Sequence, residues 1–405
     1  MNGCTERLNA HLAAAKPSAT YRMIDRVAER RAAGATVISL SAGEPDFDTP
    51  THVREAAIAA IQAGHTRYTQ VAGMRTLREA VAQKYRRENG LDVSWQDTIV
   101  CSGGKQVLYN ALAATLNEGD EVIIPAPYWV SYPEMVQLAG ATSVTVPCGE
   151  ATGFKLTPLA LAQAITPRTR WLILNSPSNP TGAVYSLGEL RALADVLLGH
   201  PHVLVLSDDI YEHLIFDGAS FHTIVQVEPR LRERTLTMNG VSKAYAMTGW
   251  RIGFSTGPRW LLDAMEKLQS QQTSGACSVS QHAALAALSG PQQFVHDTRA
   301  VFERRREAMV RMLNEAPGLR CASPAGAFYA FASCEGLMGR TTAAGTRLNT
   351  DEDVALALLD EASVAVVQGS AFGLGPYIRI AYALDDRSLV RACEAIRHFC
   401  LATRS

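Results

Sequence analysis

A lysine and an arginine stand eight residues apart in the segment Val241–Gly253, which reads VSKAYAMTGWRIG. Lys243 comes directly after a predicted strand end, so its amine is placed to face a ligand. An amine there can form a Schiff base with an aldehyde cofactor, and Arg251 can hold a phosphate as a fixed cation. A lone lysine is most often a solvated surface residue, so the catalytic interpretation requires further site residues elsewhere in the chain.

A second group of polar residues follows the apolar run Val203–Leu206. Asp208 would lie at the carboxyl end of this strand, where a carboxylate can pair with a protonated pyridine nitrogen. Such a pair attracts by on the order of 4 kcal/mol at about 4 Å with an effective dielectric constant of about 20. Tyr211 could donate a hydrogen bond to a phenolic oxygen of the same ring. Asp208 could instead cap a following helix, but Asp209 fits that role equally well, which leaves Asp208 for the ring.

The segment Ser102–Gln106 joins a predicted strand to a predicted helix. Gly103 and Gly104 would let the backbone approach a phosphate, and the start of a helix supplies unpaired amides and the positive end of its dipole. A Gly-Gly pair is often no more than a turn, but its place between strand and helix favours a phosphate site. This part of the chain contains neither GxGxxG nor GxxxxGK[ST], which argues against a dinucleotide-binding or P-loop protein.

Three further residues are candidates for contacts with a ring or a carboxylate. Trp129, in PYWVS after a predicted strand, offers a flat face that can stack on a pyridine ring, although a core position fits it equally well. Asn179, fixed before Pro180, could bond a ring oxygen or a substrate carboxylate. Arg379 is the only charge in the predicted strand Tyr377–Tyr382, and an arginine can clamp a carboxylate at two points. The alternative for Arg379 is an outward-facing position on the sheet.

Short apolar strands alternate with amphipathic helices through the middle of the chain. The expected strands are Thr98–Cys101, Glu121–Ile124, Ser143–Val146, Trp171–Asn175, Val203–Ser207, Thr235–Met238 and Ile252–Ser255, and two of the expected helices are Lys105–Leu116 and Leu187–Leu198. This alternation predicts an α/β fold with a mostly parallel sheet covered by helices on both faces. In such sheets the ligand lies at the carboxyl ends of the strands, where several of the candidate residues stand.

The pattern changes after about residue 292. We expect a long charged helix (Phe294–Glu315) that ends at Pro317-Gly318, a short strand (Ala327–Phe331), a polar loop (Gly339–Asn349), a helix (Asp351–Glu361), two strands (Val364–Val367 and Tyr377–Tyr382) and a final helix. The N-terminal segment through about Pro50 is expected to join these elements. We therefore predict a large domain over residues 51–310 and a smaller α+β domain formed by residues 1–50 and 311–405.

The composition argues against several classes of function. The chain has 405 residues, 47% of them hydrophobic and 19% charged, which is ordinary for a soluble globular protein. A formal net charge of −1 argues against nucleic acid or an anionic membrane surface as a partner. We expect no signal peptide, and no stretch approaches the roughly 18 apolar residues of a membrane helix. Eight cysteines without CxxC spacing predict neither a disulfide framework nor a zinc site, so we expect reduced thiols, no metal and a cytoplasmic protein.

With these motifs the chain resembles the class I aminotransferases of pyridoxal-phosphate (PLP) fold type I. Within the aspartate aminotransferase family it is most similar to the branch that includes aspartate/prephenate aminotransferases. The resemblance covers nearly the whole chain, from KPSAT (residues 16–20) and AGEPDFD (residues 42–48) to the strand around Arg379. Ser242–Gly253 is its most specific signature, and Ser176–Gly182 and Ser207–Leu214 are strong. It implies PLP as cofactor, amino acids and 2-oxo acids as substrates, and an obligate homodimer with shared active sites.

The resemblance also implies a role for each candidate residue. Around the cofactor, Lys243 would hold PLP and shuttle the proton, Asp208 would hold the ring nitrogen, Tyr211 and Asn179 would hold the ring oxygen, and Trp129 would stack on the ring. Gly103, Gly104, Lys105, Arg251 and the nearby Ser242 would surround the phosphate, which Tyr68 would reach from the neighbouring subunit. Arg379 would bind the substrate α-carboxylate, helped by the backbone of Gly43 and by Asn179.

Two positions bear on the side chain of the substrate. In this branch of the family a lysine after the Gly-Gly turn and a threonine in the KPSAT segment meet the distal carboxylate, and here they are Lys105 and Thr20. They favour a dicarboxylic substrate, either aspartate, glutamate or the keto acid prephenate, turned over by a ping-pong mechanism. Gly240 departs from the pattern, because many relatives carry a phosphate-binding serine there. Tyr21 and His282 also differ from the residues expected in close relatives.

Other PLP enzymes on the same fold share the cofactor motifs. A C–S lyase, a cyclase, an oxidase, or an aminotransferase for aromatic or specialised-pathway acids would also carry Lys243, Asp208 and Arg379. Lys105 and Thr20 favour dicarboxylate transamination over these alternatives. A non-catalytic PLP-binding regulator would need a fused DNA-binding domain, and neither a basic recognition segment nor the necessary residues before the KPSAT segment are expected.

Overall fold

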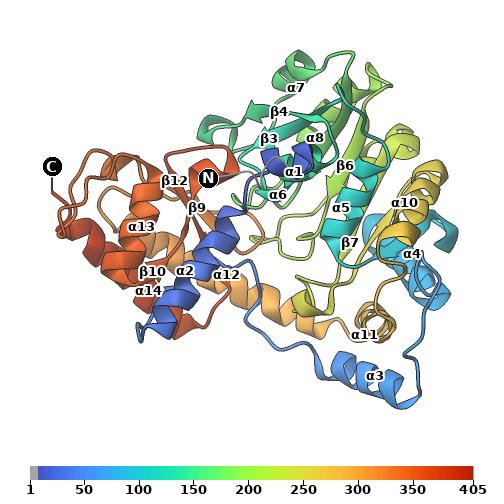
Figure 1. Cartoon of the computed structure of the whole chain (residues 1–405), viewed down its shortest axis with the longest axis horizontal. Coiled ribbons are helices and arrows are strands. Elements are labelled where there is room, and N and C mark those ends of the chain that lie inside the picture. Colours follow the sequence, from blue (N-terminus) through green and yellow to red (C-terminus); the bar gives the residue numbers. More distant parts are fainter. Residues whose placement is uncertain (1–7, 405) are drawn as a thin grey trace.

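A seven-stranded sheet forms the centre of the larger part of the molecule (Figure 1). In this computed structural model, which describes residues 8–404, the strands run in the order β2-β8-β7-β6-β5-β3-β4. Their bounds are β2 (Thr98–Cys101), β3 (Glu121–Ala126), β4 (Thr142–Pro147), β5 (Thr169–Asn175), β6 (Leu204–Asp208), β7 (Thr235–Gly240) and β8 (Gly253–Thr256). Neighbours pair in parallel except at β8, which is antiparallel to both β2 and β7. The mostly parallel sheet predicted from the sequence is confirmed.

Helices cover both faces of this sheet because its strands are apolar on both sides. In β5, Leu172 and Leu174 join one hydrophobic cluster, while Trp171 and Ile173 join the cluster on the opposite face. The first face is covered by α4 (Arg75–Asn89), α7 (Pro158–Ala164), α8 (Leu187–Leu198) and α11 (Ser278–Ser289), and the second by α5 (Gly104–Ala113), α6 (Ser131–Leu138) and α10 (Arg259–Gln272). A strand buried on both faces needs apolar residues at successive positions, which explains continuous runs such as WLIL in β5.

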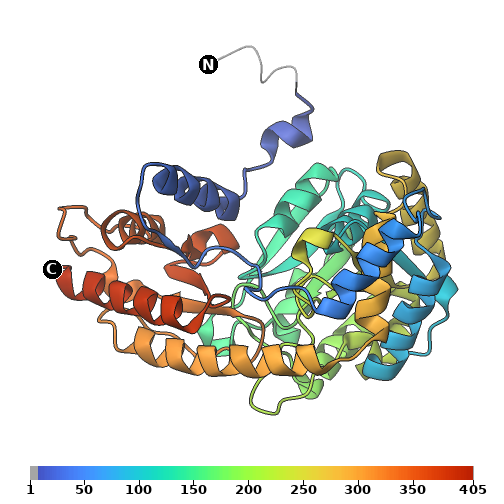
Figure 2. The ribbon, with the colours of Figure 1, turned by 90° about the horizontal axis from the view of Figure 1, so that it is seen from below.

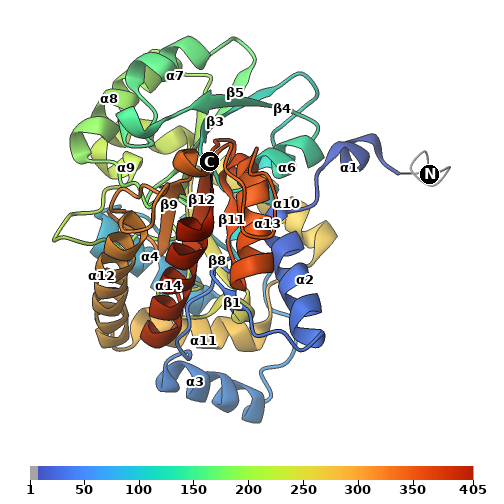
Figure 3. The same cartoon turned by 90° about the vertical axis from the view of Figure 1, so that its left-hand side faces the viewer.

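The second part of the molecule is built on a smaller antiparallel sheet with the order β11-β12-β9 (Figure 3). Its strands are β9 (Tyr329–Ser333), β11 (Val367–Gln368) and β12 (Tyr377–Ala381), and a separate parallel pair joins β1 (Ile38–Ser39) to β10 (Val364–Ala365). Its helices are α2 (Ala19–Ala32), α13 (Asp351–Ala362) and α14 (Asp386–Ala402). One hydrophobic cluster unites both ends of the chain here, with members from Met23 to Leu40 and from Phe302 to Cys400.

Helix α12 (Gln293–Asn314) connects the two parts. Its residue Val295 belongs to a cluster of the large sheet, whereas Phe302 belongs to the cluster of the second part. In Figure 2, α12 is the long orange helix that runs along one side of the molecule. Arg305, in the middle of the helix, pairs with Asp46 at 2.7 Å and with Asp386 at 2.8 Å. These ion pairs join the N-terminal segment and α14 to the connecting helix.

The ends of several helices carry the signals that their sequences predict. Ser186 and Glu189 form a capping box at the start of α8, and α4 ends in Gly90, whose φ of 65° is readily adopted by glycine. The remaining helices are α1 (Ala10–Ala14), α3 (Thr51–Gln62) and α9 (Ile224–Val227), with short 3₁₀ segments at residues 95–97, 150–152, 229–234, 248–250, 335–337 and 369–372. None of the helices within residues 8–404 is both long and apolar enough to cross a membrane.

The structure differs from the predicted elements in three places. The expected strand Val364–Val367 is divided between β10 and β11, which belong to different sheets. The expected strand Ala327–Phe331 begins two residues later, because Ala327 has a φ of 58° and its amide bonds the carbonyl oxygen of Leu214. The helix-cap role expected for Asp209 is wrong. Residues 210–213 form a turn, and the Asp209 carboxylate accepts a hydrogen bond of 2.6 Å from the Ser207 hydroxyl instead.

Gly253 marks the point where β8 passes under α5. A Cβ atom at this position would lie 2.7 Å from the Cα of Gly104, which is too close for unstrained packing. We expect Gly253→Ala to lower the free energy of unfolding by about 1–3 kcal/mol, because relieving the clash requires β8 and α5 to separate. Urea unfolding followed by circular dichroism measures the change. The control is Gly149→Ala, where φ is −81° and no atom lies within 4 Å of the added Cβ, and an equal loss in both variants would contradict the prediction.

Candidate active site

A cavity of about 490 Å³ lies between the carboxyl ends of the central strands and the second part of the molecule. It is lined by most of the residues that the sequence singled out, namely Thr20, Gly43, Gly104, Lys105, Trp129, Asn179, Asp208, Tyr211, Ser242, Lys243, Arg251 and Arg379. Gly103 directly precedes α5, next to this wall, whereas Tyr68 lies in a different hollow. The fold therefore brings together candidates that are more than 350 residues apart in the chain, from Thr20 to Arg379.

Lys243 extends into the cavity from the segment that follows β7. Its Nζ donates a hydrogen bond of 2.7 Å to the carbonyl oxygen of Gly43 and lies 6.0 Å from the ring centroids of Tyr211 and Phe328. Burial lowers the pKa of Lys243 to about 8, although the negative charge of Glu44 acts in the opposite direction. An amine with this pKa is partly unprotonated near neutral pH and can act both as a nucleophile and as a base.

Asp208 is the last residue of β6 and is only 3% exposed. Its Oδ2 accepts a hydrogen bond of 2.6 Å from the Tyr132 hydroxyl, and its carbonyl oxygen accepts one of 2.9 Å from Asn175 Nδ2. Burial raises the pKa of Asp208 to about 6, and the hydrogen bond from Tyr132 only partly offsets this effect. A buried carboxylate of this kind gains stability when a cation comes to lie beside it.

Positive charge gathers at the start of α5. Gly103 has a φ of 89°, and a Cβ atom on it would collide with the Arg251 guanidinium, so glycine is required on both counts. Lys105 Nζ lies 4.8 Å from the ring centroid of Trp129, and burial and the nearby Arg251 both lower the pKa of this lysine. Two cations beside the free amides of a helix start form a site for a phosphate or a similar anion.

Arg379 is buried in β12, with 2% of its surface exposed, and it faces the cavity. Its Nη1 donates a hydrogen bond of 3.2 Å to Asn179 Oδ1, and its Nη2 donates one of 2.5 Å to the carbonyl oxygen of Ser41. The Nε of Arg379 is buried without a hydrogen-bond partner. The outward-facing position is therefore excluded, and the side chain can still receive an anion from the cavity.

The pattern of charges fits a flat, phosphorylated ring that carries a positive nitrogen. The cations and amides at the start of α5 suit the phosphate, and the Trp129 ring lines the wall of the same cavity. Asp208 decides the fit, because a neutral or anionic ring would leave this carboxylate buried without a positive partner. These are the properties of protonated PLP.

Comparison with known proteins identifies the family. Residues 35–396 match the family model for class I and II aminotransferases. The chain belongs to this family. It is 56% identical over 393 residues to the aspartate/prephenate aminotransferase of Cereibacter sphaeroides, and the match covers 97% of this chain and 98% of that protein. An aspartate aminotransferase structure from Rhizobium meliloti superposes with a TM-score of 0.96 at 49% identity, covering 98% of this chain and 100% of that one.

A further similar structure was solved with maleate. The aspartate aminotransferase of Thermus thermophilus with maleate matches with a TM-score of 0.90 at 42% identity, over 97% of this chain and 99% of that one. Fold type I aminotransferases depend on PLP, so this aminotransferase uses PLP as its cofactor. The recognition of the family, the fold class and the cofactor predicted from the sequence are thus confirmed.

Other residues complete the wall of the aminotransferase cavity. The ring of Trp129 packs edge-to-face on Tyr132, with 5.4 Å between the centroids. Ser242 is buried next to Lys243, and the Oγ1 of Thr20 is buried without a hydrogen-bond partner. Tyr21 lines the cavity while 62% of its surface is exposed, so it stands at the mouth. The hydroxyl of Thr20, which projects from α2, is therefore free to bind a group of a ligand.

Tyr68 stands apart from the cavity of its own chain. It is 95% exposed and lines a separate surface hollow together with His65 and His282, whose rings stack at 4.6 Å between centroids. Its own chain therefore gives Tyr68 no contact with the residues around the start of α5. His282, noted as unusual in the sequence, belongs to this hollow and not to the cavity.

A serine in place of Gly240, the departure noted in the sequence, would be tightly packed against its neighbours. A Cβ atom there would lie 3.0 Å from the carbonyl oxygen of Ile252 and 3.2 Å from the Cδ1 of Ile210. A serine would therefore press on β8 and on the turn after β6.

The sequence motifs missed residues that support the site. Tyr132 bonds Asp208, the hydroxyls of Tyr329 and Tyr211 lie 2.8 Å apart, and the carbonyl oxygen of Ser41 bonds a guanidinium. Tyr132 stands next to the PYWVS motif, which was a usable signal. No local sequence pattern indicated Tyr329 or Ser41, because their hydrogen-bond partners lie more than 100 residues away in the chain.

The lowered pKa of Lys243 predicts how the stability of the cofactor-free protein depends on pH. An unfolded lysine titrates near about pH 10.4. Since Lys243 in the folded protein titrates near pH 8, the unfolded state binds more protons between these values, and stability rises with pH. We expect Lys243→Met to be more stable than the wild type at neutral pH, and this advantage to shrink by about 2 kcal/mol by about pH 10.

Urea unfolding of both cofactor-free proteins at the two pH values measures this difference. The matched control is Lys155→Met, because Lys155 pairs with Glu189 outside the cavity. An advantage of Lys243→Met that does not change with pH would show that the buried amine keeps an ordinary pKa.

Proposed function

We propose that this aminotransferase moves the α-amino group between aspartate or glutamate and a 2-oxo acid, either 2-oxoglutarate or oxaloacetate, with prephenate as a further acceptor. One observation carries the proposal. Arg379, Lys105 and Arg251 line the same cavity, and none of them forms an ion pair with a carboxylate of residues 8–404. A dicarboxylic amino acid together with PLP brings three anionic groups, namely two carboxylates and a phosphate. They equal these cations in number and carry the opposite charge.

The substrate would be held at both of its carboxylates. Arg379 binds the α-carboxylate through its free Nε and its outer nitrogens, beside Asn179 and the backbone of Gly43. Lys105 and the unpartnered Thr20 hydroxyl bind the distal carboxylate. Two fixed points set the direction of the α-hydrogen, so the proton-transfer group always meets it from the same side.

The cofactor would be held by its phosphate, its ring face and its ring nitrogen. Arg251, Ser242 and the backbone at Gly103 and Gly104 hold the phosphate, with Tyr68 contributed by a second subunit. Trp129 covers the ring face, Asp208 pairs with the nitrogen, and Tyr211 and Asn179 bond the ring oxygen. Bound PLP supplies an aldehyde that takes up the amino group and a cationic ring that accepts the electron pair left when the α-hydrogen departs as a proton.

Lys243 would carry both the cofactor attachment and the proton transfer. Once released by an incoming amino acid, the free Nζ would take the α-proton of the substrate. It would then deliver this proton to the former aldehyde carbon of the cofactor. A pKa near 8 serves both steps, because the amine must accept the proton and release it again. The keto acid leaves before the second substrate binds, so the kinetics are ping-pong.

The names of similar proteins support this choice of substrate. The protein from Cereibacter sphaeroides is called an aspartate/prephenate aminotransferase, and the one from Rhizobium meliloti an aspartate aminotransferase. The Thermus thermophilus enzyme was solved with maleate, a four-carbon dicarboxylate. Aspartate, prephenate and maleate each carry two carboxylates, which fits the cations of the cavity.

We also propose that the enzyme is a homodimer in which Tyr68 of each subunit reaches the phosphate of its partner. Three large apolar or aromatic side chains support this proposal by their exposure, because Tyr68 and the α3 residues Ile58 and Ile61 each have more than half of their surface open to solvent. Exposed apolar groups on a folded protein commonly mark an interface.

The cellular location and the division into domains belong to the same proposal. The cytoplasm is supported by free thiols, because the seven cysteines within residues 8–404 form no disulfide. The division into a large domain (51–310) and a small domain (1–50 and 311–405) is supported by the hydrophobic cluster that joins α2 to the C-terminal elements. The small domain would then carry Arg379 toward the cofactor when substrate binds.

Replacement of Lys243 tests the function directly. We expect Lys243→Ala to lose the visible absorbance of the covalently held cofactor and to lose transfer activity by at least about 10³-fold, because the other amine of the cavity, that of Lys105, is assigned to the distal carboxylate of the substrate. Absorbance spectra and single-turnover assays with aspartate measure both effects. Lys155→Ala is the control and should behave like the wild type. A fully active Lys243→Ala would overturn the assignment, whereas pyruvate and ammonia formed from a cysteine conjugate without a keto acid would favour a C–S lyase.

Replacement of Lys105 tests the dicarboxylate site. Half-reactions with aspartate, glutamate and alanine compare substrates with and without a distal carboxylate. We expect Lys105→Met to lower kcat/KM for aspartate about 10- to 100-fold more than for alanine, because only aspartate loses a charged partner. A loss of equal size for aspartate and alanine would assign Lys105 to the phosphate alone and remove the proposed substrate.

A further inference from the structure

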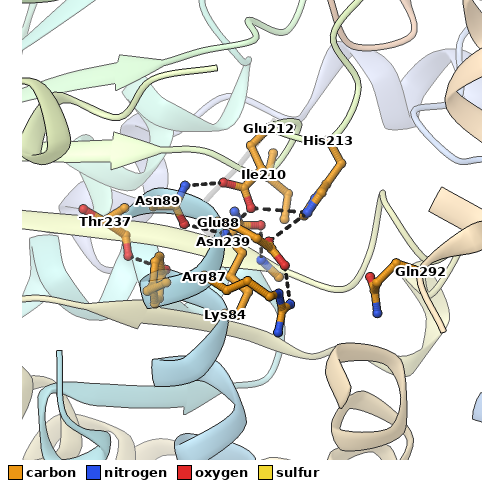
Figure 4. Close-up of polar contacts among 12 residues, drawn as sticks. Lys84, Arg87, Glu88, Asn89, Ile210, Glu212, His213, Thr237, Asn239 and Gln292 are labelled. Atoms are coloured by element: carbon orange, nitrogen blue, oxygen red, sulfur yellow. Dashed lines mark hydrogen bonds and ion pairs between the residues drawn. The ribbon is translucent and has the colours of Figure 1, made fainter. Parts of the chain in front are cut away.

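A second group of buried charges lies behind the turn that follows β6, outside the cavity (Figure 4). Lys84 of α4 forms an ion pair with Glu212 of the turn, and the two side chains are only 1% and 3% exposed. Asn89, at the end of α4, accepts a hydrogen bond of 2.8 Å from Lys84 and donates one of 2.8 Å to Glu212. Next to the pair, His213 Nε2 lies 3.0 Å from Glu88 Oε2.

These side chains resemble a metal site but already contain their cation. The ligand atoms of Glu88, Glu212 and His213 all lie within 4.8 Å of one another. The Lys84 ammonium pairs with Glu212 and lies 3.5 Å from Glu88 Oε2, so it occupies the position that a metal ion would take. The cluster is therefore a buried ion pair with its hydrogen-bond partners.

The turn has two faces with different neighbours. Asp208 and Tyr211 line the cavity, whereas Asp209 and Glu212 are buried on the opposite side. Few backbone hydrogen bonds hold the turn, among them Asp209 N to Met238 O at 3.0 Å and Glu212 N to Asp209 O at 3.0 Å. Since Tyr211 and Glu212 are adjacent in a turn without a helix or strand of its own, a shift of Glu212 moves Tyr211.

Helix α4 is itself fixed to the sheet beside the ion pair. The hydroxyl of Tyr85, the residue after Lys84, donates a hydrogen bond of 2.8 Å to the carbonyl oxygen of Thr237 in β7. Lys84 therefore projects from a rigid position. Its partner Glu212 stands on a turn that belongs to no helix or strand.

We propose that the Lys84–Glu212 ion pair positions Asp208 and Tyr211, and so sets the contacts of the cofactor ring from outside the cavity. The inference rests on the proposed roles of Asp208 and Tyr211 in holding the cofactor. Breaking a buried pair by removing one member leaves an uncompensated charge, which must reach water or take up a proton. For Glu212 the first outcome requires the turn to move, and the second changes the hydrogen bonds that hold its carboxyl group.

The neighbouring acids are consistent with this balance of charge. Burial, reinforced by the charge of Glu212, raises the pKa of Asp209 to about 7, so this acid is partly neutral. Burial opposes ionisation of Glu88 too, but the hydrogen bond from His213 and the charge of Lys84 bring its pKa down to about 2. Glu88 is also bonded by Arg87, which leaves Lys84 to balance Glu212.

Replacement of Lys84 tests the proposal in the complete enzyme. We expect Lys84→Met to shift the pH midpoint of the bound-cofactor absorbance by about 0.5 pH unit or more, because Tyr211 and Asp208 no longer meet the ring in the same geometry. We expect kcat to fall on the order of tenfold, with KM nearly unchanged, because Arg379 and Lys105 stand on other elements. In the cofactor-free protein, hydrogen exchange of the amides of residues 209–214 should become faster.

Two variants separate positioning from a general loss of stability. Lys84→Met/Glu212→Gln removes both charges and should return the midpoint and the exchange rates part of the way to wild-type values. Glu121→Gln removes a carboxylate at the amino end of β3 that pairs with Arg168, away from the carboxyl ends of the strands, and should lower thermal stability without moving the midpoint. A Lys84→Met enzyme with reduced thermal stability but a wild-type midpoint and wild-type exchange would overturn the proposal.

Two outcomes would otherwise be confused, and further measurements keep them apart. A wild-type protein that binds no PLP would overturn the proposed function, while the exchange measurement on the cofactor-free protein would still test the ion pair. If Lys84→Met does not fold, Asn89→Ser replaces it, because it removes one hydrogen bond from each member of the pair and leaves both charges in place. A smaller shift in the same direction is then expected, and no shift would overturn the proposal.

Discussion

Arg379, Lys105 and Arg251 line one cavity, and no carboxylate within residues 8–404 forms an ion pair with any of them, which is the constraint on which the site depends. Arg379 is buried, and a buried charge without compensation costs several kcal/mol, so neutral groups must hold this guanidinium until an anion arrives. The carbonyl oxygen of Ser41 holds the guanidinium of Arg379, and that of Thr248 holds Arg251 at 2.8 Å. Ligand binding and charge compensation are therefore the same event, which favours anionic ligands over neutral ones.

This arrangement explains why the site lies between two parts of the chain. The sheet supplies the start of α5 and the end of β6, but Arg379 belongs to β12 in the second part. The N-terminal segment connects the two, because the carbonyl oxygens of Ser41 and Gly43 bond Arg379 and Lys243 respectively. Any movement of this segment therefore changes the surroundings of the Arg379 guanidinium and of the Lys243 amine together.

Local signals were enough to predict the cofactor side of the site and most of the sheet. Lys243 and Gly103 are marked by their places after a strand and before a helix, and periodicity finds β5 because both of its faces are buried. Contacts between segments that are distant in the chain are not indicated by any local sequence pattern. The bond between Tyr211 and Tyr329 joins residues 118 positions apart, and the ion pair between α4 and the turn depends on how the helix lies on the sheet. The proposed contact of Tyr68 with a second subunit cannot be read from a single chain.

The turn after β6 shows why the sequence could not assign its two adjacent acids. Asp208 and Asp209 are both buried, and burial raises the pKa of each, to about 6 and about 7. Because successive side chains at a strand end point to opposite sides, only Asp208 faces the cavity and can gain a cation from a ligand. Asp209 does not face the cavity and so cannot pair with a cation of a ligand there. It accepts a hydrogen bond from the Ser207 hydroxyl, on the side where Lys84 and Glu212 form their ion pair. One short segment thus presents one carboxylate to the cavity and keeps the other beside a buried ion pair.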